Sequence, residues 1–507
     1  MQLQQLVFSL LSVASVARAL TVLTTPTPSA DRLPLAQSDK LRRVLTRKAL
    51  LKHANKFLKF SQTDPDGNRG FGGVGHNLTA NYLYNTFSTG DMADYYTVEK
   101  QMFIHEYAYG TTKVIIEGQT HESSYFTYSP STDGELKLPL GLAANLGCTP
   151  EDYPDLTGKI ALISRGTCEF GLKSVLAGKA GAQGILIYNN VPGIANGGTY
   201  GSPVRELGPY VPGAMISQAD GLTLVADLKA GPVTATFNVE ALSENRTTFN
   251  VIAQTKGGDQ KNVVALGGHT DSVGAGPGIN DNGSGTIGIL EVAKALTKYS
   301  VNNAVRFCFW SAEEFGLVGS AKYVESLPTK ELDKIALYLN FDMIASPNYV
   351  YFVYDGDGSA SNLTGPAGSD KIKHMFEEHF LNVGWKVKPT AFNGRSDYGP
   401  FIEVGIPSGG LFTGAEGVKT AEEAAYYGGK AGAWYDPNYH RAGDNVKNCD
   451  LNAWITNTKA IAHSVATYAC STESIPKRAP AKAKREFRPK AKSHMHHSHC
   501  GHEDLLE

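Results

Sequence analysis

The sequence predicts an α/β fold with a central, mostly parallel mixed sheet flanked by helices, into which a small α+β module is inserted. Three observations carry this prediction. Strand-like and helix-like segments alternate in the second half of the chain, and its strand-like segments are apolar throughout, as in sheets covered on both faces. The stretch 140–235 instead has short apolar runs broken by Gly, Pro and Asn, which indicates a compact unit of its own. A chain of 507 residues has room for one large domain and such additions.

The N-terminus, residues 1–19, is typical of a secretory signal. An apolar run over 6–16 ends in the small-x-small tripeptide 17–19 and is too short to span a bilayer. No Lys or Arg precedes this run, so a buried N-terminal helix is the alternative. The signal predicts a secreted or vacuolar protein, and no other stretch is apolar enough for a membrane anchor.

The main domain is expected at 66–139 and 236–473, on either side of the inserted unit at 140–235. Before it, residues 20–65 contain a basic, helix-patterned stretch, and part of this segment could be a removable pro-segment. After it, the Lys-, Pro- and His-rich tail 474–507 cannot bury enough apolar surface to fold alone. Its histidines could still collect metal ions.

Each predicted element follows from its hydrophobic period. The strands are continuous apolar runs, and the helices repeat apolar residues at helical spacing. In the main domain they are strands at 262–268, 304–310 and 335–343 and helices at 285–298, 315–326, 369–383 and 451–468. The inserted unit contributes strands at 160–163, 184–188 and 213–216 and a helix at 172–180. Active sites of such sheets gather at the carboxyl ends of the strands.

Polar residues that could hold metal ions or move protons follow these predicted strands. They are His269, Asp271, Asp281, Glu313, Glu314, Asp342 and His440. Taken singly, Asp281 could cap a helix, and the adjacent glutamates could lie in a solvated loop. Asp342, however, interrupts an apolar run, where a carboxylate without a partner is strongly destabilising. Imidazole and carboxylate ligands without a thiolate suit a catalytic zinc pair.

The motifs around these residues resemble those of the co-catalytic zinc aminopeptidases of the aminopeptidase Y and fungal leucine aminopeptidase type. The matching motifs are His269-Thr-Asp271, Asn280-Asp281-Asn-Gly-Ser-Gly, Glu313-Glu314, Asn340-Phe-Asp342-Met and Tyr439-His440, and the resemblance covers residues 66–470. The inserted unit, with its Gly-Lys-Ile-Ala-Leu-Ile-Ser-Arg-Gly-Thr-Cys run, is similar to a protease-associated domain.

The resemblance implies two Zn²⁺ ions per chain and an aminopeptidase acting on peptides with a free N-terminus, with a preference for hydrophobic N-terminal residues. It implies that one zinc is bound by His269, Asp281 and Glu314. The other would be bound by Asp281, Asp342 and His440.

The resemblance also assigns roles to residues that hold no metal. Glu313 is the general base, and Asp271 positions the first histidine. Tyr439 is expected to stabilise the oxyanion, although it could be ordinary packing. Arg395 is expected to face the substrate beyond the cut bond, although it could simply pair with Asp397.

Other functions on the same scaffold remain open at this point. A metallo-carboxypeptidase could use Arg395 for a terminal carboxylate, and a glutaminyl cyclase is a further alternative. A non-enzymatic receptor is disfavoured because the full set of metal ligands is retained.

Six cysteines suit an exported protein with structural disulfides. Two pairs about twenty residues apart could close small loops, Cys148 with Cys168 and Cys449 with Cys470. Cys308 lies in an apolar run and is expected to be a buried thiol.

The surface is expected to carry glycans and little net charge. Sequons predict glycosylation at Asn77, Asn245 and Asn362, whereas Asn282 lies beside a metal ligand and is expected to stay unmodified. A net charge of −2 gives no reason to expect nucleic acid or an anionic membrane as partner. We expect a monomer that binds peptides.

Overall fold

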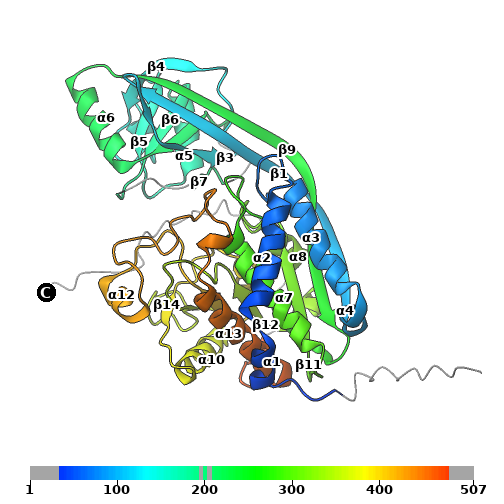
Figure 1. The fold of residues 1–507 in the computed structure, drawn as a ribbon. Helices are drawn as coiled ribbons and strands as arrows, with labels where there is room; N and C mark the ends of the chain where they lie inside the picture. The colour runs from blue at the N-terminus through cyan, green and yellow to red at the C-terminus, as the bar shows by residue number, and fades with distance from the viewer. Residues whose placement is uncertain (1–32, 193–197, 202–207, 479–507) are drawn as a thin grey trace, which may run out of the picture.

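The computed structural model of the chain describes residues 33–192, 198–201 and 208–478, so the expected signal and most of the tail lie outside the described residues. The described chain forms a large lobe and a small lobe joined by a long two-stranded arm (Figure 1). The arm consists of β1 (Tyr96–Ile116) and β9 (Thr234–Thr255), which pair antiparallel along their whole length. The sequence predicts that the main domain resumes at 236, but it does not predict that one strand runs through both lobes.

The large lobe is built around a mixed, mostly parallel sheet, as the sequence predicts. Its strands are β10 (Asp259–His269), β11 (Asn303–Trp310), β12 (Ile335–Phe341), β13 (Phe352–Tyr354), β14 (Lys388–Thr390) and β15 (Ser408–Phe412). Their order is β14, β13, β15, β12, β10, β11, β9. The four strands β11, β10, β12 and β15 are parallel neighbours, and β9 and β13 pair antiparallel on either side.

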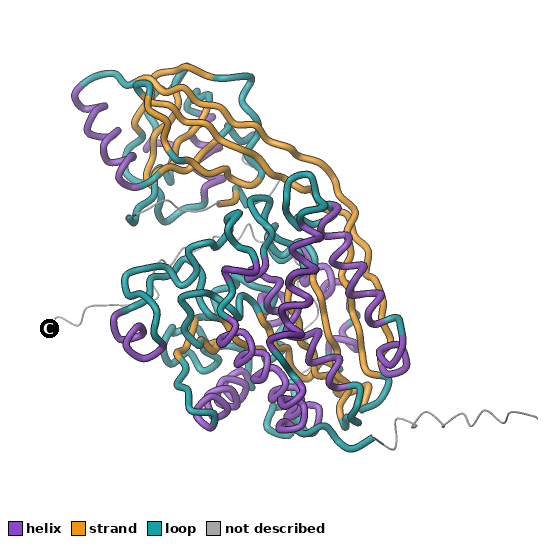
Figure 2. The backbone as a smooth tube through the Cα atoms, viewed as in Figure 1, coloured by secondary structure: helices purple, strands orange, loops and turns teal. Residues whose placement is uncertain are grey.

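Helices cover both faces of this sheet. They are α1 (Ser38–Val44), α2 (Arg47–Ser61), α3 (Val74–Phe87), α4 (Gly90–Tyr95), α7 (Gly285–Leu296), α8 (Val318–Ser326), α9 (Thr329–Leu332), α10 (Ser369–Asn382), α11 (Gly399–Glu403), α12 (Ala421–Tyr427) and α13 (Leu451–Cys470), with short turns η3 (Ile279–Ser284) and η4 (Val446–Asn448). On β11, Val305 and Phe307 join the core beneath α2, α7 and α13, whereas Cys308 and Trp310 join the core beneath α8 and α11. Helices surround the strands of the large lobe (Figure 2). Burial on both faces explains why these strands are apolar throughout.

The helix-patterned N-terminal stretch forms two helices, α1 and α2. The chain is extended at Leu45, and the side chain of Thr46 then caps α2 by accepting the N–H of Ala49 at 3.2 Å. Leu41 of α1 and Phe57 of α2 are fully buried in the main core. Both helices are therefore part of the folded lobe.

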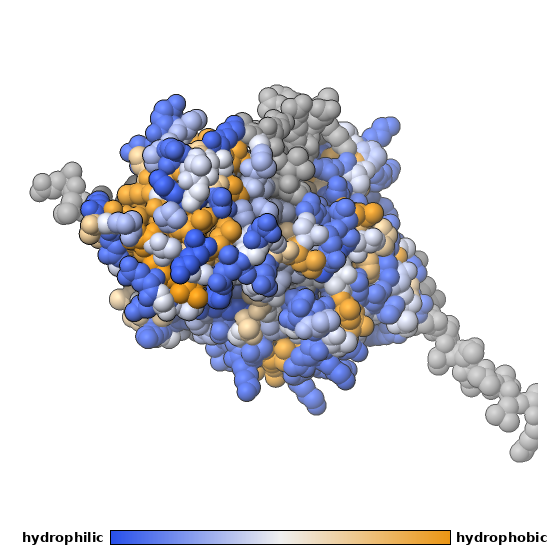
Figure 3. All heavy atoms as spheres, turned by 90° about the horizontal axis from the view of Figure 1, so that it is seen from above, coloured by the Kyte–Doolittle hydropathy of each residue, from blue (hydrophilic) through white to orange (hydrophobic). Residues whose placement is uncertain are grey.

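The small lobe contains the strands and the helix that the sequence indicates for the inserted unit. It comprises β2 (Gln119–His121), β3 (Ser123–Thr127), β4 (Leu136–Leu142), η2 (Pro150–Asp152), β5 (Ile160–Ser164), α5 (Phe170–Lys179), β6 (Gly184–Tyr188), β7 (Gly198–Thr199), β8 (Gly213–Ile216) and α6 (Gln218–Ala230). Strands β4, β5, β6 and β8 are parallel neighbours, β3 pairs antiparallel with β8, and the short β7 pairs with the other side of β3. Seen from above, apolar residues gather on one side of this lobe and polar residues cover most of the remaining surface (Figure 3).

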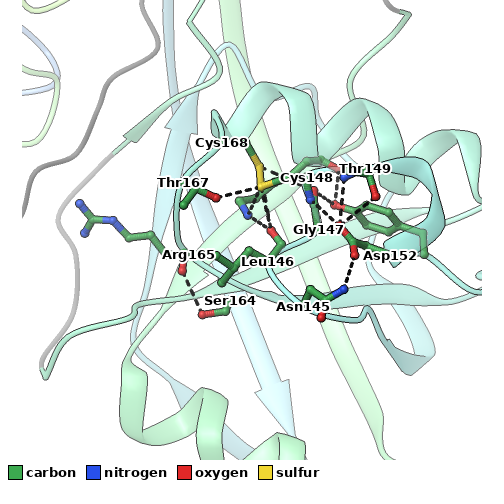
Figure 4. Close-up of a disulfide and its surroundings, with 12 residues drawn as sticks. Asn145, Leu146, Gly147, Cys148, Thr149, Asp152, Ser164, Arg165, Thr167 and Cys168 are labelled. Carbon is green, nitrogen blue, oxygen red and sulfur yellow. Dashed lines mark hydrogen bonds between the residues drawn. A yellow bond between two sulfur atoms is a disulfide. The ribbon is translucent and has the colours of Figure 1, made fainter.

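One of the two candidate disulfides is present. Cys148 and Cys168 are bonded, with their Cα atoms 5.7 Å apart, and tie the chain after β4 to the chain before α5 (Figure 4). The pairing of Cys449 with Cys470 is wrong, because both thiols are free. The two residues flank α13, whose 20 residues span about 30 Å, whereas bonded Cα atoms lie within about 7 Å. Cys308 is a buried free thiol, as expected.

Within the described residues, no helix combines the length and the apolar character needed to cross a membrane.

Candidate active site

The structure brings the predicted metal ligands together at one edge of the large sheet. His269 is the last residue of β10, and Glu313 and Glu314 follow β11. Asp342 directly follows β12. Since these three strands are parallel neighbours, their carboxyl ends share an edge. Two loops complete the group by supplying Asp281, within η3, and His440, between α12 and η4.

Asp281 lies at the centre of the group and faces a different histidine with each carboxylate oxygen. Its Oδ1 is 3.2 Å from His269 Nε2, and its Oδ2 is 3.2 Å from His440 Nε2. A second carboxylate approaches each ring: Asp342 Oδ1 lies 3.4 Å from His269 Nε2, and Glu314 Oε2 lies 3.1 Å from His440 Nε2. The contacts therefore form two three-residue groups that share Asp281.

These distances fit a pair of zinc ions. Tetrahedral zinc with bonds of about 2.0–2.1 Å separates neighbouring ligand atoms by roughly 3.3 Å. The four observed nitrogen–oxygen distances are 3.2, 3.2, 3.4 and 3.1 Å. In addition, Glu314 Oε1 and Asp342 Oδ1 are buried without a hydrogen-bond partner among the described residues. A bound cation would satisfy buried carboxylate oxygens in that state.

The contacts favour a different grouping from the one implied by the resemblance. The resemblance implies that Glu314 shares a zinc with His269 and that Asp342 shares a zinc with His440. Ligand atoms of His269, Asp281 and Glu314 do lie within 4.8 Å of one another. The direct contacts, however, join His269 to Asp342 and His440 to Glu314.

The charges of the group shift its pKa values strongly. Burial lowers the pKa of His269 and of His440, but the surrounding carboxylates outweigh burial, and both pKa values lie well above the usual range. Burial opposes ionisation of Asp281, yet contacts with the two histidines lower its pKa. Burial and neighbouring carboxylates raise the pKa of Glu313 well above its usual range. A bound cation favours the ionised form of a carboxylate, so it would lower the pKa of Glu313 and lower that of Asp281 further.

Glu313 lies beside the two groups without joining either. Its Oε2 is 3.9 Å from His269 Nε2, and its side chain lines the same pocket as Asp281 and Asp342. This is the placement expected for a base that accepts a proton from an attacking water.

Asp271 connects the first histidine to the glutamate pair. The carbonyl of Asp271 lies 3.2 Å from His269 Nδ1, whereas the nearer oxygen of its carboxylate lies 3.7 Å away. The carboxylate accepts the backbone N–H groups of Glu313 and Glu314 at 3.1 and 3.4 Å. Asp271 thus links the end of β10 to the turn after β11.

Tyr439 and Arg395 line the same pocket. The rings of Tyr439 and His440 stack with their centroids 3.8 Å apart. Arg395 Nη2 lies 3.3 Å from the hydroxyl of Tyr439. Arg395 Nη1 pairs with Glu416 at 2.7 Å. The alternative pairing of Arg395 with Asp397 is wrong, because among the described residues Arg395 forms its ion pair with Glu416. Asp397 is fully buried, and burial raises its pKa to about 7.

The pocket is small and partly aromatic. Its cavity measures about 80 Å³, enough for several water molecules or one amino-acid side chain. Besides the metal group, its lining includes the apolar residues Met343, Tyr354, Ala391, Phe412 and Ala415 and several polar residues, among them Thr390 and Asn393. This composition suits an apolar side chain.

Two supporting residues were missed although they lie within four residues of a predicted site residue, Ser396 beside Arg395 and Asp444 after His440. Ser396 donates to Asp342 Oδ2 at 2.6 Å and accepts from Asn340 Nδ2 at 2.8 Å. Asp444 accepts the backbone N–H groups of Asn280 and Asp281 at 2.8 and 3.0 Å. Ser396 thus orients the carboxylate of Asp342, and Asp444 fixes the backbone at Asp281, both predicted metal ligands.

Arg69 was also missed, and no sequence pattern marks it. It is fully buried, and its guanidinium donates to the carbonyls of Thr270, Pro277 and Gly278. It therefore fixes the segment that joins His269 to Asp281.

The predicted glycosylation sites differ in exposure. Asn245 and Asn362 are exposed, whereas Asn77 lies in α3, is half-buried and donates its amide to Gly72 O at 2.8 Å. Asn282 is buried, and its amide donates to Phe341 O at 2.9 Å.

A mostly parallel sheet whose strand ends and adjoining loops gather histidines and carboxylates in two groups is typical of a metal-dependent enzyme. Comparison with known proteins identifies the class further: residues 250–465 match peptidase family M28, and residues 134–224 match the PA domain. The chain is 54% identical over 455 residues to a probable leucine aminopeptidase 2 of Aspergillus fumigatus, covering 89% of each chain. It is 50% identical over 475 residues to leucine aminopeptidase 2 of Arthroderma otae, covering 93% of this chain and 94% of that one.

Solved structures agree. An aminopeptidase from Aneurinibacillus superimposes with a TM-score of 0.68 at 27% identity, covering 88% of this chain and all of that one. A zinc aminopeptidase from Bacillus subtilis superimposes with a TM-score of 0.60 at 25% identity, covering 85% and 98%. The chain belongs to peptidase family M28 and carries an inserted PA domain, which confirms the resemblance and the fold class predicted from the sequence.

Proposed function

We propose that this protein is a two-zinc aminopeptidase that removes N-terminal, preferably hydrophobic residues from peptides. The observation that carries the proposal is the shared carboxylate of Asp281, with one histidine and one further acid at each of its oxygens. The relatives named leucine aminopeptidase and the apolar residues in the pocket lining support the substrate class.

His269, Asp281 and Asp342 would hold one zinc, and Asp281, Glu314 and His440 the other. When bound, such a pair supplies an activated water and polarises the scissile carbonyl. Every other task falls to the side chains of the chain itself.

Glu313 accepts a proton from the attacking water at a carboxylate oxygen and passes it to the leaving amine. Burial of Glu313 keeps bulk water from competing for that proton. The Tyr439 hydroxyl stabilises the oxyanion, and burial, which raises its pKa well above the usual range, keeps it a proton donor. Asp271 and Ser396 hold the ligands in register.

The domain arrangement and location are part of the proposal. The peptidase domain would comprise 66–139 and 236–473, with the PA domain at 140–235 between them. We expect a monomer that is exported to the vacuole or the medium, glycosylated at Asn245 and Asn362, and without nucleic-acid partners.

The test is release of amino acids from peptides by wild type and Glu313→Gln. The variant should lose about 10²–10⁴-fold in kcat while elemental analysis still finds two zinc ions. Glu378→Gln, a change at an exposed glutamate of α10, is the control and should be fully active. Full activity in Glu313→Gln would contradict the base assignment.

A second comparison separates the alternatives. Peptides blocked at the amino end should resist cleavage, and peptides blocked at the carboxyl end should be cleaved. The reverse pattern would indicate a carboxypeptidase, and ring closure of N-terminal glutamine without hydrolysis would indicate a cyclase.

A further inference from the structure

A buried ammonium lies inside an oxygen-lined loop next to the substrate pocket. The loop, residues 355–361, follows β13, and Lys373 reaches it from α10. Lys373 Nζ lies 2.7 Å from Asp355 Oδ1, 2.6 Å from Asp357 Oδ1 and 2.7 Å from Ser359 Oγ. The Lys373 side chain is only 4% exposed and that of Asp355 is fully buried.

The loop has the features of a metal-ion loop. Oxygen donors at every second residue, Asp355, Asp357 and Ser359, match the spacing that calcium loops use at their first three ligand positions. Glycines stand between them, and Gly358 has a φ of 70°, which a turn around a central ion requires. The distances of 2.6–2.7 Å to the ammonium are close to calcium–oxygen bonds of about 2.3–2.6 Å.

The rest of the loop is arranged around the same centre. Asp355 Oδ2 accepts the backbone N–H groups of Ala360 and Ser361, both at 2.9 Å, so its second oxygen holds the loop closed. Contact with Lys373 lowers the pKa of Asp357, and contact with both aspartates raises that of Lys373 against the effect of burial. At neutral pH the ammonium of Lys373 and the carboxylate of Asp357 are therefore both charged.

This centre adjoins one wall of the substrate pocket. Tyr354, which lines the pocket, directly precedes Asp355, and the N–H of Asp355 donates to Thr390 O at 2.7 Å. Tyr354 in turn stacks on Phe392, with ring centroids 5.3 Å apart and an interplanar angle of 13°. Loosening the loop would therefore weaken the contact between β13 and β14.

We propose that residues 355–361 form a cation-binding loop whose cation is the ammonium of Lys373, and that this internal ion fixes the Tyr354 wall of the substrate pocket. If the ammonium is removed, the two aspartates are left as a divalent-cation site of the calcium class. The effect on the pocket rests on the proposed peptidase function, whereas cation binding does not.

The test uses the full-length, zinc-loaded protein with Lys373→Ala. The variant should have a lower Tm than wild type and should regain stability when Ca²⁺ is added, with calorimetric binding in the range of about 10⁻⁴–10⁻³ M. Lys371→Ala, two residues away on the same helix and exposed, should match wild type and ignore Ca²⁺. The double variant Lys373→Ala, Asp357→Asn should lose the response to Ca²⁺.

Kinetics test the second half of the proposal. With a substrate that has a large N-terminal side chain, Lys373→Ala should raise KM several-fold while kcat changes less, and Ca²⁺ should restore KM. If KM is unchanged, the ammonium of Lys373 does not fix the Tyr354 wall of the pocket.

Two results would overturn the cation site: a Tm equal to that of Lys371→Ala, or a lowered Tm that Ca²⁺ does not restore. If Lys373→Ala fails to fold, refolding in zinc-containing buffer with and without Ca²⁺ decides, since only a vacated cation site gives calcium-dependent recovery. Neither measurement needs peptidase activity, so failure here is distinct from failure of the proposed function.

Discussion

Replacing Arg69 by Met should destabilise the protein through the metal-binding loops. The guanidinium donates to three buried carbonyls, those of Thr270, Pro277 and Gly278, and lies 5.3 Å from the ring of Phe57. Methionine fills much of the space but leaves these carbonyls without a donor. Burial lowers the pKa of Arg69 to about 10, so the side chain is charged at neutral pH and the lost interactions are charge-assisted.

The magnitude follows from the three lost partners. An unsatisfied buried carbonyl costs about 1–3 kcal/mol, and entry of water offsets part of this, so the variant should lose ~3–6 kcal/mol. At about 2 °C per kcal/mol, Tm should fall by roughly 6–12 °C. Because the loosened segment joins His269 to Asp281, zinc affinity should also fall by about 10–100-fold.

Differential scanning calorimetry and zinc titration of the metal-free protein measure the two effects. Arg43→Met is the control, because Arg43 is exposed and pairs only with Asp39 one turn away, so its loss should cost less than about 0.5 kcal/mol. If the Tm of Arg69→Met equals that of Arg43→Met, the guanidinium does not stabilise the loops that carry His269 and Asp281. If Tm falls but zinc affinity is unchanged, Arg69 stabilises the lobe without positioning the ligands.

Two further predictions concern protonation. Burial, followed by the neighbouring His463, lowers the pKa of His379 to about 3, so the unfolded state binds the proton first as pH falls below about 6.5, and stability is lost towards acid. The loss through this group should reach about 2 kcal/mol at pH 5, and urea unfolding at pH 7.5 and 5 should show a smaller difference for His379→Gln than for wild type. The raised pKa values of His269 and His440 mean that both rings are charged in the metal-free protein, so zinc binding at neutral pH should release protons. Calorimetry in buffers of different ionisation enthalpy measures their number, and zinc binding without proton release would contradict the pKa shifts.

The sheet and the ligand set could be predicted because their signals are local. Continuous apolar runs mark strands covered on both faces, and a carboxylate such as Asp342 that interrupts an apolar run needs a partner in any fold. The residues after such strands meet because parallel neighbours end at one edge. Local sequence patterns are therefore enough to predict the strands of the large sheet and the polar residues at their carboxyl ends.

Other features depend on distances that no local pattern contains. The grouping of Glu314 and Asp342 with different histidines depends on side-chain directions at the ends of two strands. The proposed Cys449–Cys470 bridge relied on spacing in sequence, but a helix of 20 residues converts that spacing into a long separation in space. A fully buried arginine such as Arg69 looks like a surface residue until the fold closes around it.

The same non-local contacts limit how much of the N-terminal segment a pro-segment could include. Residues before α1 already pair with the large lobe, since Ser300 N donates to Pro34 O at 2.8 Å and Ala36 N donates to Ser300 O at 3.0 Å. Leu41 is buried beyond that pair, and Phe57 packs against the guanidinium that fixes the metal loops. Cleavage after α1 or α2 would remove core residues and loosen the support of Arg69. A removable segment compatible with this fold therefore ends before Pro34, and we expect loss of the rest of the segment to weaken the predicted metal site.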